Sequence, residues 1–188
     1  KLAAVYFEAE KWGKVVGVTD AASLNDVIGA GDVDALIQMV EALHEKKVAQ
    51  IADVIASNRD RIAVVLIAGP SSSGKTTFAQ RLRVQLRVNG LNPVPISLDD
   101  YFVDRADTPR DEHGEYDFES IDAIDVPLLN EHMTRMIQGE EVEVPVFDFL
   151  AGKRAPRSRP IRLERDQMLI IEGIHGLNDK LTRSIPMG

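Results

Sequence analysis

Apolar residues are arranged along this chain in patterns that predict both strands and helices. Three short apolar runs, at 62–68, 94–98 and 167–171, have the length and the Val and Ile content of buried strands. Pro93 and Pro95 cannot donate hydrogen bonds to a neighbouring strand, so the second of these strands is expected at the edge of its sheet. Together with helical patterns between the strands, the runs predict one α/β domain.

Apolar positions that recur every three and four residues predict long amphipathic helices. Between Asp32 and Ser57 this spacing is sustained, with Asp32 as the N-cap and a break expected near Lys46 and Lys47. A second helical pattern covers 78–88 and ends at an Asn-Gly pair, a common helix terminator.

The region from 125 to 163 predicts a helix followed by an antiparallel ribbon. Asp125 caps the helix, and His132 lies on its buried face, where a structural role is expected. Two short strands, 142–149 and 161–163, follow and are expected to be joined by a basic loop. That loop carries Lys153, Arg154, Arg157 and Arg159.

The first 20 residues contain two apolar stretches, Leu2–Phe7 and Val15–Val18, that predict strands of a small unit. Residues 1–20 are therefore interpreted as the tail of a preceding domain, 21–60 as a helical connector, and 61–188 as the main domain.

Composition narrows the classes of protein to which the chain can belong. Its 188 residues are 44% hydrophobic, carry a net charge of −8 and include no cysteine. Without a dense basic block, nucleic acid is a poor candidate partner, and no apolar run of about 18 residues predicts a membrane helix. The missing cysteines fit a cytoplasmic protein, and a homo-oligomer stays open.

The segment Gly69–Thr77 fits the phosphate-binding pattern G-x-x-x-x-G-K-[ST], between a predicted strand and a predicted helix. Its glycines let backbone N–H groups approach phosphate oxygens, and the helix N-terminus adds further donors. Lys75 is expected to contact the β- and γ-phosphates, and Thr76 to ligate magnesium. The predicted phosphate-binding residues are Gly69, Ser71, Ser72, Ser73, Gly74, Lys75, Thr76 and Thr77.

Two acids follow predicted strands at the ends where ligands bind in open parallel sheets. Asp99 follows the strand at 94–98, and Glu172 follows the strand at 167–171. A phosphate loop, a metal-supporting acid and a carboxylate able to deprotonate a hydroxyl are the requirements of phosphoryl transfer. The residues thus predict a small-molecule kinase. A regulatory ATPase and a nucleotide-binding module without turnover stay open as alternatives.

Five segments resemble, in order and spacing, the uridine kinase / phosphoribulokinase family. They are Gly69–Thr77, Ser97–Phe102, Tyr116–Phe118, Pro145–Phe149 and Ile170–Ile174. The resemblance implies a phosphate-loop kinase fold that uses ATP and Mg²⁺ and phosphorylates the 5′-hydroxyl of a nucleoside, or, as an alternative, a sugar phosphate. It also implies that the family's C-terminal strands and arginine-bearing lid are missing from this chain.

The same resemblance assigns roles to individual residues. Asp99 matches the catalytic base, with Lys75 as the catalytic cation, and the metal-site residues are Thr76, Glu172 and Asp99. The expected substrate-binding residues are Tyr101, Phe102, Asp117, Phe147 and Arg154. This chain has Phe102, Phe147 and Gly152 where the family's uridine-cytidine kinases usually carry Tyr, Tyr and His. Residues 1–60 are similar to the region preceding the kinase in larger bacterial uridine kinase-like proteins, a region that resembles accessory domains of threonyl-tRNA synthetase.

Overall fold

The computed structural model describes residues 2–181 and divides the chain into two compact units, Lys1–Gln50 and Ile51–Gly188. The two units are described separately below. The assignment of 1–20 to a preceding domain and of 21–60 to a connector stays a prediction.

The first unit is helical, which corrects the expectation of strands at Leu2–Phe7 and Val15–Val18. Helix α1 (Leu2–Val16) covers both apolar stretches, and α2 (Ala21–Ala30) follows it. The segment between the stretches is rich in Ala, Glu and Lys, which favour helix, and Lys14 pairs with Glu10 one turn earlier at 2.7 Å.

Helix α3 (Val33–Ser57) begins directly after Asp32 and continues into the second unit. The long helix predicted here is confirmed, but the break expected near Lys46 and Lys47 is wrong. Lysine is a good helix former, so two adjacent lysines on an exposed or half-exposed face do not interrupt the backbone hydrogen bonds.

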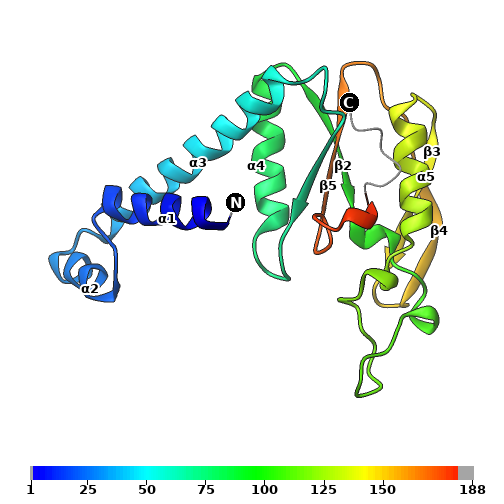
Figure 1. The fold of residues 1–188 in the computed structure, drawn as a ribbon, viewed down its shortest axis with the longest axis horizontal. Coiled ribbons are helices and arrows are strands. Elements are labelled where there is room, and N and C mark those ends of the chain that lie inside the picture. The colour runs from blue at the N-terminus through cyan, green and yellow to red at the C-terminus, as the bar shows by residue number, and fades with distance from the viewer. Residues whose placement is uncertain (1, 182–188) are drawn as a thin grey trace. The chain divides into compact units, whose positions relative to one another are not determined.

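The second unit is built on a parallel sheet of three strands in the order β1-β5-β2 (Figure 1). These strands are β1 (Val64–Ala68), β2 (Asn92–Ser97) and β5 (Gln167–Gly173). The central strand β5 buries four consecutive residues, Met168–Ile171, as expected for a strand covered on both faces. The proline-containing strand β2 lies at the edge of this sheet, which confirms the prediction.

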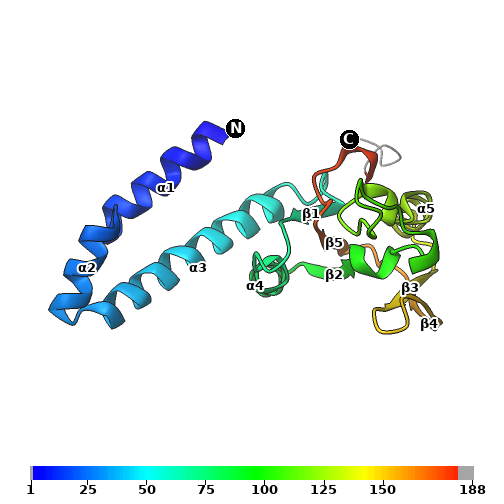
Figure 2. The same ribbon diagram turned by 90° about the horizontal axis from the view of Figure 1, so that it is seen from below.

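Helices and a ribbon flank the sheet on two sides (Figures 1 and 2). Helix α4 (Lys75–Val88) packs against all three strands on one side. On the other side of β2 lie α5 (Val126–Ile137) and the antiparallel ribbon of β3 (Val142–Asp148) and β4 (Lys153–Ile161). Short 3₁₀ helices occur at Leu98–Tyr101, Arg105–Asp107, Ile121–Ala123 and Asp179–Leu181.

The basic residues between 153 and 159 lie on strand β4 and not in a loop, which corrects the sequence prediction. The connection between β3 and β4 is confined to 149–152, where Gly152 adopts a left-handed φ of +65°. Because most residues of β4 are exposed, charged side chains are tolerated along it, and the strand gave no apolar signal.

One hydrophobic core connects the sheet to α5, because residues of β2, β5 and α5 belong to the same buried cluster. Asp125 caps α5 as predicted, since its Oδ1 accepts a hydrogen bond from the Leu128 N–H at 3.0 Å. His132 is buried on α5, which confirms its structural role.

Within residues 2–181, the helices are all too short or too polar to cross a lipid bilayer.

Candidate active site

The phosphate loop connects β1 to α4 and has the backbone shape that its sequence predicts. A Cβ on Gly69 would lie 2.5 Å from Ser73 Oγ, so any other residue here would force the Ser73 side chain to move. Ser72 and Gly74 adopt left-handed φ values of +58° and +82°. Gly74 is the N-cap of α4 and no side chain caps this helix, so N–H donors of its first turn face an anion site without internal competition.

Strand register brings the loop and both predicted acids to the same edge of the sheet. Glu172 on the central strand is aligned with Ile67 on one side and with Ser97 on the other. Gly69 and Asp99 each follow those partners by two residues. Glu172 is therefore placed between the phosphate loop and Asp99.

A direct hydrogen bond joins Glu172 to the loop. The Thr76 hydroxyl donates to Glu172 Oε1 at 3.1 Å. The other oxygen, Oε2, is enclosed and has no hydrogen-bond partner. An enclosed carboxylate oxygen without a partner is costly unless a cation binds it, so this pair has the character of a metal-supporting site.

Asp99 is half-buried and lies within electrostatic reach of the loop lysine. Burial raises the pKa of the Asp99 carboxyl, the positive charge of Lys75 opposes that rise, and the negative charge of Asp100 adds to it. The backbone N–H of Asp99 donates to Ser97 Oγ at 3.3 Å, which fixes the start of the 3₁₀ helix that carries the acid. A carboxylate held beside an ammonium group and near the phosphate loop is suited to accept a proton from a hydroxyl.

These features fit ATP and Mg²⁺. Gly69 leaves the space that a phosphate-binding loop needs, α4 offers uncapped N–H groups, and Glu172 Oε2 lacks a partner. Within residues 2–181 no group of three or more acidic or histidine side chains forms a metal cage. The Thr76 hydroxyl and Glu172 suit Mg²⁺, because this ion usually takes one or two protein ligands together with phosphates and water.

Four phenylalanine side chains form a cluster that joins the segment after Asp99 to the ribbon. The Phe102 ring contacts Phe147, Phe149 and Phe118 with centroid distances of 5.6, 6.1 and 6.2 Å. The structure thus brings together Phe102 and Phe147, which were predicted as substrate-binding residues. Both are largely buried, whereas Phe149 and Phe118 are exposed and form the accessible part of this aromatic cluster.

Asp117 and Arg154 are held by local contacts. The half-buried Asp117 accepts the Glu119 N–H at 3.0 Å through Oδ1, which orders the loop around it. Arg154 pairs with Asp125 Oδ2 at 2.8 Å, and its backbone N–H donates to Asp104 Oδ1 at 3.0 Å. Arg154 therefore ties the ribbon to the start of α5 through its Nη2, while its enclosed Nε has no hydrogen-bond partner.

Tyr101 is a core residue in this structure, in contrast to its predicted place in a substrate-binding surface. It is 0% exposed, and its hydroxyl lies 3.1 Å from His132 Nδ1. Burial raises the pKa of Tyr101 and lowers that of His132, so both groups are neutral at pH 7. Its neighbour Phe102, also largely buried, is the residue that contacts the aromatic cluster, and a substrate contact of Tyr101 stays a prediction.

We expect Tyr101→Phe to lower the free energy of unfolding by about 1 kcal/mol, because it removes one buried hydrogen bond and leaves His132 Nδ1 unpaired. Nucleotide binding should be unchanged. Urea unfolding measures the effect, with Tyr116→Phe as the matched control at a half-exposed tyrosine. A loss of nucleotide or acceptor affinity without loss of stability would return Tyr101 to the binding surface.

The sequence did not point to several charged contacts around the site. Asp100 pairs with Arg159 of β4 at 3.0 Å. The Arg105 Nη2 donates to the Phe149 carbonyl at 3.0 Å, and a Cβ on Gly152 would lie 2.7 Å from the Arg105 guanidinium. Arg83 lies on α4 on the same side as Thr76, and their helical spacing is the one signal that could have identified it.

The fold and this site together define a phosphate-loop protein of the kinase class: a parallel sheet, a loop shaped for phosphates, and acids at the carboxyl ends of the adjacent strands. Comparison with known families agrees. The sequence profile described as "Phosphoribulokinase / Uridine kinase family" matches residues 64–186. The chain belongs to this family.

Within the aligned regions, about a third of the residues of this chain are identical to those of curated relatives. The uridine kinase of Proteus mirabilis is 32% identical over 131 residues, which are 69% of this chain and 61% of that protein. The uridine kinase of Schizosaccharomyces pombe is 33% identical over 127 residues, which are 66% of this chain but 27% of that protein. The uridine kinase of Chloroflexus aurantiacus is 32% identical over 111 residues, which are 59% of this chain and 51% of that protein. The chain thus spans between about a quarter and three fifths of these relatives.

A solved structure supports the fold. The structure of a possible uridine kinase from Bacillus stearothermophilus superposes with a TM-score of 0.54 and 24% identity. The match covers 69% of this chain and 73% of that one.

Proposed function

We propose that this protein is part of an ATP-dependent kinase that transfers a phosphoryl group to the 5′-hydroxyl of a nucleoside, with uridine as the first candidate. The observation that carries the proposal is the position of Glu172, hydrogen-bonded to Thr76 of the phosphate loop and aligned on its strand between that loop and Asp99. Membership of the kinase family and uridine kinases among its relatives support it.

Each of these residues has a distinct task in the proposed reaction. Backbone N–H groups of the loop and of the first turn of α4 bind phosphate oxygens, and Lys75 neutralises charge at the phosphoryl group. Thr76 and Glu172 would hold Mg²⁺, which when bound neutralises phosphate charge. Asp99 accepts the proton of the attacking hydroxyl, with Lys75 close enough to favour its ionised form.

The acceptor side consists of Asp117 and the aromatic cluster of Phe102, Phe118, Phe147 and Phe149. A carboxylate can accept hydrogen bonds from sugar hydroxyls, and exposed aromatic rings can stack on a nucleobase. The rings of Phe102 and Phe147 carry no polar group, and Gly152 has no side chain. Base recognition by these positions therefore depends on stacking, and we expect weak discrimination between pyrimidine bases.

We expect ADP release from ATP and Mg²⁺ to depend on an added nucleoside, when the protein is assayed with a panel of nucleosides, sugars and sugar phosphates. Asp117→Asn should raise the acceptor KM by about 10-fold and leave the ATP KM unchanged, because it weakens charge-assisted hydrogen bonds to the acceptor alone. The exposed Asp107→Asn is the matched control.

Two results would count against this assignment. ADP release that is equal with and without every acceptor would favour a regulatory ATPase. Transfer to sugar phosphates but to no nucleoside would place the chain with the sugar-phosphate kinases of its family.

Cytoplasmic location stays a prediction from the lack of cysteine.

A further inference from the structure

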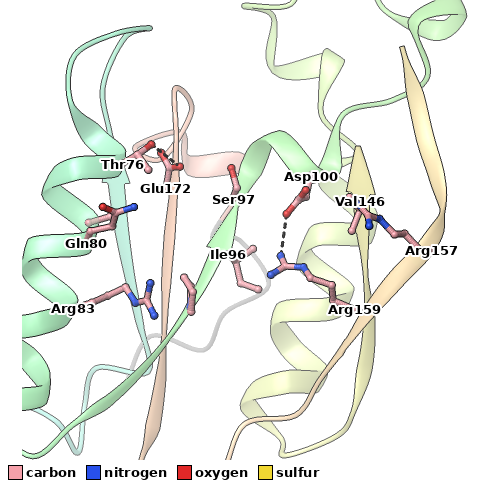
Figure 3. A pocket seen from close by; sticks show the side chains of 12 residues that line it. Thr76, Gln80, Arg83, Ile96, Ser97, Asp100, Val146, Arg157, Arg159 and Glu172 are labelled. Atoms are coloured by element: carbon pink, nitrogen blue, oxygen red, sulfur yellow. Dashed lines mark hydrogen bonds and ion pairs between the residues drawn. The ribbon is translucent and has the colours of Figure 1, made fainter. Parts of the chain in front are cut away.

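A pocket of about 530 Å³ opens beside the Thr76–Glu172 pair, between α4, the end of β2 and the ribbon (Figure 3). Thr76 and Glu172 line one end of it, and Asp100 and Arg159 line the other. Neither Asp99 nor Phe102 is among its lining residues. Its volume is in the range of small-molecule sites, and it is distinct from the aromatic cluster proposed for the acceptor.

Three guanidinium groups line this pocket from two elements. Arg83 comes from α4, and Arg157 and Arg159 come from β4. Figure 3 shows Arg83 and Arg159 extending toward the pocket from opposite sides. Three cations around one small volume attract anions to it, although the net charge of the whole chain is −8.

Protein carboxylates satisfy only part of this charge. Asp100 pairs with Arg159 at 3.0 Å. Glu172 also lines the pocket, but it is hydrogen-bonded to Thr76 and is part of the metal-supporting site. Arg83 Nε is enclosed and has no hydrogen-bond partner. An enclosed guanidinium donor without an acceptor is costly, and a bound anion would remove that cost.

We propose that this pocket binds the phosphate or carboxylate group of a small molecule, with Arg83 and Arg157 as its main ligands and Arg159 held in place by Asp100. A guanidinium fork matches two oxygens of such a group, which a lysine would not do as well. The anionic group belongs either to the acceptor itself or to a second small molecule that regulates the kinase. Both sources share the chemistry that the arginines recognise.

Binding of inorganic phosphate tests the site without any turnover, so the result does not depend on the proposed function. Calorimetry is done on the Lys75→Ala variant, in which the phosphate loop has lost its cation, and again after adding Arg83→Gln or Arg157→Gln. We expect each arginine change to weaken phosphate binding by about 10-fold, because each removes a charge-assisted contact. Arg87→Gln, one turn further along α4 and outside the pocket, is the matched control and should have no effect.

Three outcomes of this experiment would overturn the proposal: no phosphate binding once Lys75 is replaced, binding that is equally strong in Arg83→Gln and Arg157→Gln, or an equal loss in Arg87→Gln. Thermal unfolding of each variant shows whether it is folded, and two independent arginine changes on different elements guard against a local folding defect.

Kinetics with the intact phosphate loop then separate the two sources. If the acceptor supplies the anion, Arg83→Gln raises KM for phosphorylated or carboxylated acceptors and leaves KM for neutral nucleosides unchanged. If a second molecule supplies it, Arg83→Gln leaves every acceptor KM unchanged and removes the effect of added phosphate on the rate. Either pattern supports the anion site.

Discussion

Replacing Lys75 by alanine is expected to lower phosphoryl transfer by about 1,000-fold, the largest loss from any single change in this chain. The ammonium group is positioned by the loop at the N-terminus of α4 and acts electrostatically on Asp99. Its loss removes the cation that neutralises the migrating phosphoryl group and also a charge that favours the ionised form of Asp99. Lys75→Arg keeps the charge but not the size, so it should lose less.

Thr76→Ala is expected to lower the rate for a different reason than Lys75→Ala. The Thr76 hydroxyl is hydrogen-bonded to Glu172 of the proposed metal site and not to Asp99, the proposed catalytic base. The rate should fall by about 10-fold or more at fixed Mg²⁺, and part of this loss should be recovered at higher Mg²⁺ concentration. Thr76→Ser is the matched control, since it keeps the hydroxyl. Steady-state rates over a Mg²⁺ titration measure the effects of both the Lys75 and the Thr76 substitutions. Full activity in both alanine variants would mean that the loop does not bind the phosphoryl donor.

The strands of the main domain could be predicted because each is a short apolar run between turn signals. Residues 167–171 read as a buried strand, and Met168–Ile171 are buried in the structure. The order β1-β5-β2 could not be obtained in this way, since local pattern carries no information about which strand is central. That order places Glu172 between the phosphate loop and Asp99, so the geometry of the site depends on tertiary structure.

The first residues show where the apolar pattern was misleading. Val5, Tyr6 and Phe7 form a continuous apolar run, as in a strand, but they lie on helix α1 and are 64–67% exposed. Because these side chains are exposed, burial did not select a strand, and the helix-favouring residues that follow them determined the local structure.

The candidate site was predicted best where one segment carries the whole signal. The phosphate loop needs only its own glycines and the adjacent helix, and the structure has its expected shape. Contacts between distant segments were missed. Asp100 and Arg159 are 59 residues apart, and nothing in either local sequence indicates their ion pair.

Asp99→Asn is expected to lower the rate of transfer by about 100-fold or more while ATP affinity is largely kept, because the amide is isosteric but cannot accept the hydroxyl proton. Single-turnover kinetics and nucleotide titration separate the two effects. A loss that lies wholly in nucleotide or Mg²⁺ affinity would make Asp99 a metal ligand only, and the base would then be sought at Asp100.

The pH dependence of transfer gives a second and independent test of Asp99. Burial and Asp100 raise the pKa of Asp99 above its ordinary value, and a base must be deprotonated to act, so kcat/KM should fall as the pH drops through this raised pKa. Asp100→Asn removes the like charge, which lowers the pKa of Asp99 and should move the acidic limb of the profile to lower pH. Asp107→Asn, at an exposed acid in the following 3₁₀ helix, should leave the limb in place. An acidic limb that stays unmoved in Asp100→Asn, or that persists in the residual activity of Asp99→Asn, would assign the titrating group to another residue.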